Sequence, residues 1–179
     1  MAAMTASGFW NPWRITGWGL ALCLVLTPLV AMQVSREWNW GPFDFLFAIA
    51  VIGGTGLVLE LALRASRNPF YRSGAVLALL TTFLLVWINA AVGLLEDDND
   101  TGHMMLAAVL LILLVGVVLS RLRAPGLARA LLAAAVTLAV SAIAALILGL
   151  NPKGIILCLI FAGMWLVSAV LFARAARVP

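Results

Sequence analysis

The segment "LARALLAAAVTLAVSAIAALILGL", residues 127–150, decides the fold. It carries a single charged side chain, Arg129, near its beginning. An α-helix rises about 1.5 Å per residue, so a helix of this length crosses the roughly 30 Å hydrocarbon core of a bilayer. Inside that core a backbone has to satisfy its own hydrogen bonds, and the segment lacks the alternation of a barrel strand. The segment therefore predicts a transmembrane helix.

Five more runs of this kind occur along the chain. The six predicted helices are 15–34, 43–62, 74–95, 104–120, 127–150 and 154–173. The 179 residues are 65% apolar and 10% charged, with a mean hydropathy of +1.15. A soluble domain has about 45–50% apolar and about 25% charged residues. We therefore predict an all-α polytopic membrane protein, a bundle of six transmembrane helices with short loops that forms one transmembrane domain over residues 1–179.

Charge and cysteine content exclude several functional classes. The formal net charge is +4, yet the basic residues are spread between apolar runs. A nucleic-acid-binding protein gathers such residues into one patch, so we expect the lipid bilayer as a partner and no nucleic acid. Cys23 and Cys158 lie within apolar runs, where a thiol packs as a small apolar group. The sequence therefore predicts no disulfide, no metal site and no cofactor.

Lysine and arginine fall unevenly on the two sides of the predicted helices. Nine lie on one side: Arg14, Arg64, Arg67, Arg72, Arg121, Arg123, Arg129, Arg174 and Arg177. Arg36 and Lys153 lie on the other side. Because cytoplasmic loops carry the excess of Lys and Arg, both termini are predicted to be cytoplasmic. The outer loops are then 35–42, 96–103 and 151–153.

Small residues are frequent within the predicted helices. The sequence "GGTG" at 53–56 and the alanine-rich run 127–150 would let helix backbones approach closely. Close approach is how helices pack in lipid, where no hydrophobic driving force acts between them. The loop 151–153 is so short that consecutive helices are expected to be antiparallel neighbours.

The second predicted outer loop is acidic. Its titratable residues are Glu96, Asp97, Asp98 and Asp100, followed by His103. A calcium loop that began at Asp97 would need a bidentate Glu at its twelfth position, which is Ala108. A zinc site would need more than one His or Cys. We expect a solvated loop whose carboxylates favour the N-terminus of the next helix; a cation-attracting mouth and a specific divalent-ion site are the alternatives.

Three polar residues within or beside the predicted helices have two interpretations each. Asp44 lies near a helix start, where the helix dipole favours an acid. Glu60 precedes Arg64 by four residues, the spacing of an ion pair on one helix face. Asn89 lies about 9 Å below the predicted outer interface, where its amide would bond to another helix. Alternatively, the three line a polar pathway beneath the acidic loop, since polar groups inside a membrane are often functional.

The sequence holds no motif for nucleophilic, metallopeptidase or phosphate chemistry. It has no Gly-x-Ser-x-Gly, no His-Glu-x-x-His and no phosphate-binding glycine loop before a helix. We therefore predict that the protein is not an enzyme. Its expected role is that of an interaction or accessory component whose partners are other membrane proteins or a second copy. The alternative is a small cation- or proton-coupled transporter or channel with an acidic outer mouth.

Three stretches of the sequence point to a family. They are "EWNWGPFDF" at 37–45, "ELALR" at 60–64 and "FLLVWINAAVG" at 83–93 with the acidic loop behind it. Together they resemble a group of small bacterial multi-pass inner-membrane proteins for which no activity is assigned. In that group the acidic loop has a Glu-Asp-Asn-Pro-like ending, whereas here residues 96–100 read Glu-Asp-Asp-Asn-Asp. The resemblance, which covers the chain up to residue 105, implies a bacterial inner-membrane location and marks Asp44, Glu60 and Asn89 as the first residues to mutate.

Overall fold

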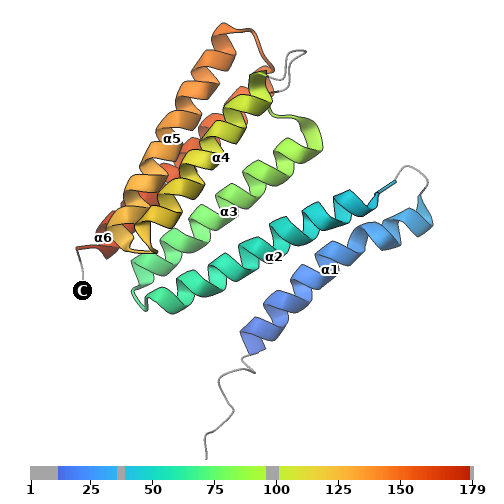
Figure 1. Ribbon diagram of the computed structural model, residues 1–179, viewed down its shortest axis with the longest axis horizontal. Helices are drawn as coiled ribbons and strands as arrows, with labels where there is room; N and C mark the ends of the chain where they lie inside the picture. Colours follow the sequence, from blue (N-terminus) through green and yellow to red (C-terminus); the bar gives the residue numbers. More distant parts are fainter. Residues whose placement is uncertain (1–11, 36–38, 96–100, 178–179) are drawn as a thin grey trace, which may run out of the picture. The chain divides into compact units, whose positions relative to one another are not determined.

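The computed structural model describes residues 12–35, 39–95 and 101–177. Within these residues the chain forms six α-helices and no strand (Figure 1). They are α1 (Pro12–Val34), α2 (Pro42–Ala65), α3 (Pro69–Val92), α4 (Thr101–Ser120), α5 (Ala124–Ile147) and α6 (Pro152–Ala175). Each is long and apolar enough to cross a bilayer. The predicted fold class and the six predicted helices are confirmed, and the protein is a multi-pass integral membrane protein.

Several helices begin earlier than the apolar runs predict. α3 begins at Pro69 instead of residue 74, and α5 begins at Ala124 instead of 127. Before α3, the Oδ1 atom of Asn68 accepts hydrogen bonds from the backbone N–H groups of Phe70 (2.9 Å) and Tyr71 (3.4 Å). This N-cap satisfies donors that the first turn leaves unpaired. Hydropathy marks the part of a helix inside the lipid, whereas at α3 the cap decides where the helix starts.

Proline opens five of the six helices. It is the first residue of four of them and the second residue of α5: Pro12, Pro42, Pro69, Pro152 and Pro125. The fixed φ of proline suits a helix, and its missing N–H is one of the donors that a first turn leaves without a partner. These prolines therefore help to start the helices to which they belong.

Contacts divide the chain into two compact units, Met1–Val58 and Leu59–Pro179, and the division falls within α2. In the first unit, α1 and the larger part of α2 face each other at Trp18 and Gly56. A Cβ atom built on Gly56 would lie 3.4 Å from Cη2 of the Trp18 ring. Few side chains of α1 are buried, so this unit has a small core of its own.

The second unit contains a close-packed helical core. Here α6 packs against both α3 and α5, and α5 also packs against α4. Leu85, Val109, Leu138, Trp165 and Phe172 are among its buried side chains. The expected packing of consecutive helices is confirmed for α4 with α5 and for α5 with α6. The main partner of α3, in contrast, is α6.

Small residues bring α4 and α5 close together. A Cβ atom on Gly116 would lie 2.6 Å from the Cβ of Ala130, and one on Gly126 would lie 2.7 Å from the Cβ of Ser120. Gly116 and Ser120 are four residues apart on α4, and so are Gly126 and Ala130 on α5. The two antiparallel helices therefore pair matching small-residue motifs, the arrangement that lets helix backbones meet in lipid.

Candidate functional site

Asp44 caps the start of α2. Its Oδ2 atom accepts a hydrogen bond from the backbone N–H of Gly41 at 2.7 Å. Gly41 precedes the helix and Asp44 is its third residue, so this bond is one half of a capping box. The rings of Trp40 and Phe45 lie 5.4 Å apart in an edge-to-face contact, which is the pairing of a hydrophobic staple. Asp44 thus has the capping role that its position predicts.

Glu60 forms an ion pair with Arg64, one turn further along α2. The Glu60 side chain is 20% exposed and that of Arg64 is 62% exposed. The exposed guanidinium therefore reaches back to a carboxylate that is largely shielded from solvent. The pair predicted from the four-residue spacing is confirmed.

Asn89 closes the C-terminal end of α3. Its Oδ1 atom accepts a hydrogen bond from the backbone N–H of Leu94 at 3.1 Å, and its carbonyl accepts one from Gly93 at 2.9 Å. Gly93 has a φ of 60°, the left-handed conformation in which glycine ends helices. The amide oxygen is therefore bound by the turn that follows its own helix. The bond to another helix, predicted from the depth of Asn89, is not the one observed for this oxygen.

The turn after α3 lies against the first turns of two other helices. A Cβ atom on Gly154 of α6 would overlap the carbonyl oxygen of Leu94, and one on Gly102 of α4 would overlap that of Leu95. Both leucines are 1% exposed. Glycine alone lets a backbone carbonyl come this close, and a helix N-terminus favours the negative end of the carbonyl dipole. Sequence reasoning missed this contact, whose only signal was a glycine in each first turn.

The acidic loop between α3 and α4 is outside the described residues, and with it Glu96, Asp97, Asp98 and Asp100. His103, the third residue of α4, is described and exposed. Among the described residues, no group of three or more His, Cys, Asp or Glu side chains is placed to hold a metal ion. The roles of the loop as a solvated cap, a cation-attracting mouth or a divalent-ion site stay predictions.

Glu60 and Asn89 do not meet at one place in the second unit. Glu60 lies near the end of α2, where α3 begins, whereas Asn89 lies in the last turn of α3, 20 residues beyond Pro69. At about 1.5 Å per residue, Asn89 is about 30 Å along α3. Asp44 belongs to the first unit. Glu60 and Asn89 therefore each have a local partner and do not belong to one common site in the second unit.

Two hydrogen bonds join α3 to α6. The indole N–H of Trp165 donates to Oγ1 of Thr82 at 3.3 Å, and the hydroxyl of Ser168 donates to the carbonyl of Gly74 at 2.7 Å. Trp165 and Ser168 are fully buried. Such bonds contribute about 0.6–2 kcal/mol each between helices in a membrane. Sequence reasoning missed these residues because the register of α3 on α6 is needed to pair them.

The loop between α4 and α5 is held in an unusual conformation. Arg121 and Leu122 have φ values of 48° and 58°, a region that costs a non-glycine residue about 1–3 kcal/mol. The N–H of Leu122 donates to Oγ of Ser120 at 3.2 Å, and its carbonyl accepts a hydrogen bond from the Tyr71 hydroxyl at 2.8 Å. The backbone that leads into Arg123 is therefore tied both to α4 and to α3.

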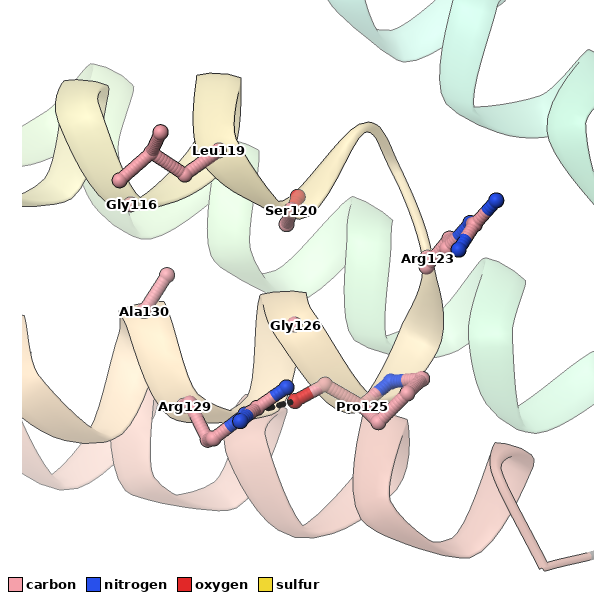
Figure 2. Close-up of a pocket in the computed structure, with 8 residues that line it drawn as sticks. All are labelled: Gly116, Leu119, Ser120, Arg123, Pro125, Gly126, Arg129 and Ala130. Carbon is pink, nitrogen blue, oxygen red and sulfur yellow. Dashed lines mark hydrogen bonds between the residues drawn. The ribbon is translucent and has the colours of Figure 1, made fainter.

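A groove opens beside this loop, between the last turns of α4 and the first turns of α5 (Figure 2). Its volume is about 580 Å³. Small or apolar side chains line it, among them Gly116, Leu119 and Ala130, together with Arg123 and Arg129. No carboxylate lines it. The groove thus combines an apolar surface with two positive charges.

No protein-family model, curated protein or solved structure matches the chain. Among the described residues predicted to carry function, Asp44, Glu60 and Asn89 have local structural partners, and His103 is exposed at a helix start. Two features of the described residues go beyond such local roles. One is a set of glycines on α1 and α2 with open space around them, and the other is the groove between α4 and α5.

Proposed function

We propose that the protein is a non-enzymatic component of a bacterial inner membrane, which acts by associating with other membrane proteins or with a second copy. The resemblance of the chain up to residue 105 to small bacterial inner-membrane proteins supports the location. The excess of arginines on one side of the six helices supports an orientation with both termini in the cytoplasm.

The observation that carries the proposal is the open space around four glycines of the first unit. A Cβ atom on Gly17, Gly19, Gly53 or Gly54 would meet no heavy atom within 4 Å. Glycine inside a helix is less stable than alanine by about 0.8–1 kcal/mol. In a membrane, packing of a second helix against the bare backbone offsets that cost. These glycines, with the low burial of α1, leave α1 and α2 open to the packing of a further helix.

The contacts of the polar residues agree with association better than with transport. Asp44 caps α2, Glu60 pairs with Arg64, and Asn89 closes α3. A cation or proton in transit would need the same oxygen atoms, so each transport cycle would have to break these pairings. If these contacts instead stabilise the helix ends and the Glu60 charge, they can stay intact throughout.

Substitution of Gly54 by leucine tests the association. Gly163 has the same open space but lies on α6, a helix of the close-packed second unit, so Gly163→Leu tests whether the effect belongs to the first unit. Donor- and acceptor-labelled full chains in vesicles should show energy transfer that Gly54→Leu reduces and Gly163→Leu leaves unchanged. A photo-crosslinker at position 54 in native membranes should give a defined product with the chain itself or with another membrane protein. A monomeric chain that gives no such product would overturn the proposal.

Ion flux in liposomes separates association from transport. Wild type and Glu60→Gln, which removes the carboxylate charge at nearly constant size, should both show the negligible proton and cation flux of empty liposomes. Flux through the wild type that falls in Glu60→Gln would overturn the proposal and favour the transporter.

A further inference from the structure

The second unit carries a large unbalanced positive charge at one end. Eight arginines lie in its α2–α3 and α4–α5 loops, in the adjoining helix turns and at the end of α6: Arg64, Arg67, Arg72, Arg121, Arg123, Arg129, Arg174 and Arg177. Glu60 is the one carboxylate among the described residues of this end, and it already pairs with Arg64. Residues 101–179 contain no Asp or Glu. The anions that balance these guanidinium groups therefore come from outside the described part of this unit.

Arg129 is placed to meet an anion at the membrane interface. It lies five residues after Ala124, where α5 begins, or about 8 Å along the helix. Its Nε donates to the carbonyl of Pro125 at 3.2 Å, so the side chain runs back along α5 towards the helix start (Figure 2). Long basic side chains of transmembrane helices reach the headgroup region in this way. The guanidinium of Arg129 consequently lies at the end of the groove beside the α4–α5 loop.

Arg123, the residue just before α5, lies at the same end of the groove. It is exposed, and its side chain forms no capping hydrogen bond with the helix. Figure 2 shows this side chain directed outward from the loop. The hydrogen bonds of Leu122 to Ser120 and Tyr71 fix the backbone, while the exposed side chain can change rotamer and turn over the groove. An anion at the mouth would therefore gain a second guanidinium.

Further into the membrane the groove is apolar. Gly116 lies one helical turn before Ser120 and faces Ala130 across the groove floor, about 6 Å from the end of α4. Leu119 borders the same space. A free inorganic anion bound at the arginines would leave this part unfilled. A phospholipid would fill it, because its glycerol and acyl chains continue from the phosphate towards the hydrocarbon.

We propose that this groove binds an anionic membrane phospholipid, with Arg123 and Arg129 on the phosphodiester and the start of an acyl chain over Gly116 and Ala130. Guanidinium groups bind phosphate oxygens through paired, charge-assisted hydrogen bonds. Basic pockets between transmembrane helices are suited to such headgroups. The lipid site involves only α4, α5 and the loop between them, so it does not depend on the proposed association through α1 and α2.

Native mass spectrometry of the full chain, titrated with phosphatidylglycerol or phosphatidylcholine in a neutral detergent, tests the site. The double variant Arg123→Gln/Arg129→Gln is compared with Arg67→Gln/Arg177→Gln, which removes two exposed arginines of the same end that do not line the groove. We expect wild type to prefer phosphatidylglycerol. The groove variant should bind it about tenfold more weakly, and the control variant should bind it as wild type does.

Two further measurements keep the inference falsifiable. Leu119→Trp fills the apolar part of the groove from an exposed position and keeps the charge, so it should also weaken phosphatidylglycerol binding; unchanged affinity would overturn the placement of the acyl chain. Equal losses in the two double variants would overturn the site, because binding would then follow total charge. Displacement of the lipid by an equal concentration of inorganic phosphate would overturn the lipid assignment in favour of a free-anion site.

Discussion

The indole N–H of Trp165 donates a hydrogen bond to the hydroxyl oxygen of Thr82 at 3.3 Å, and this bond joins α6 to α3. The Thr82 hydroxyl in turn donates to the carbonyl of Ala78 at 2.8 Å. Trp165 is fully buried, so its N–H has no water as an alternative partner. The bond therefore favours one register of α3 on α6.

We expect Thr82→Val and Trp165→Phe to be coupled. A double-mutant cycle on the free energy of unfolding, measured by titration with a denaturing detergent, should give a coupling of about 0.6–2 kcal/mol. Thr137→Val is the control, because the Thr137 hydroxyl bonds only to the carbonyl of Ala133 in its own helix. Its effect should be additive with that of Trp165→Phe. Strict additivity of the Thr82 and Trp165 substitutions would show that the indole bond contributes nothing.

Alanine at position 154 should be strongly destabilising. The added Cβ atom would overlap the carbonyl oxygen of Leu94, and a backbone carbonyl cannot move aside as a flexible side chain can. We expect a loss of at least about 2 kcal/mol in the free energy of unfolding. Gly163→Ala, at a position with open space, should instead be neutral or stabilising by up to about 1 kcal/mol. Equal stabilities of the two variants would contradict the close contact.

The capping role of Asp44 predicts a graded effect of substitution. Asp44→Ala removes the acceptor for the Gly41 N–H and should cost about 0.5–2 kcal/mol. Asp44→Asn keeps an acceptor oxygen and should cost less. Hydrogen exchange of the backbone amides at 41–46 in micelles should be faster in the alanine variant than in the asparagine variant. Identical exchange in both variants and wild type would rule out the cap.

The arginine distribution predicts the orientation of the chain in the membrane. A reporter that is active only outside the cytoplasm should be active when fused after residue 99 and silent when fused after residue 177. The physical reason is that loops rich in Lys and Arg are retained on the cytoplasmic side. A reporter at residue 99 that works only inside the cell would overturn the orientation.

Features that depend on residues within one helical turn could be predicted from the sequence. The Glu60–Arg64 pair and the Asp44 cap follow from spacing and from position at a helix start, and both are observed. The six helices could be predicted for a related reason. In lipid a long apolar segment has to satisfy its own backbone hydrogen bonds, which it does as an α-helix. That requirement does not depend on neighbouring segments.

Features that depend on how helices meet could not be predicted. The groove exists because Gly116 lies opposite Ala130, and no pattern within α4 or α5 alone fixes that alignment. Asn89 is a second example, in which a contact predicted between two helices is replaced by a local one. Its depth suggested a partner on another helix, but Gly93 ends α3 nearby and the following turn takes the amide oxygen.

The contact of the Leu94 carbonyl with Gly154 also bears on biosynthesis. The two residues are 60 positions apart in the chain, so at the usual speed of a ribosome the glycine emerges about 3–12 s after the leucine. The whole of α6 is likewise synthesised after α3 and α5, the two helices against which it packs. Its two neighbours thus enter the bilayer before the helix that joins them, and a nascent protein stalled ahead of α6 would expose unfilled interfaces to quality-control proteases.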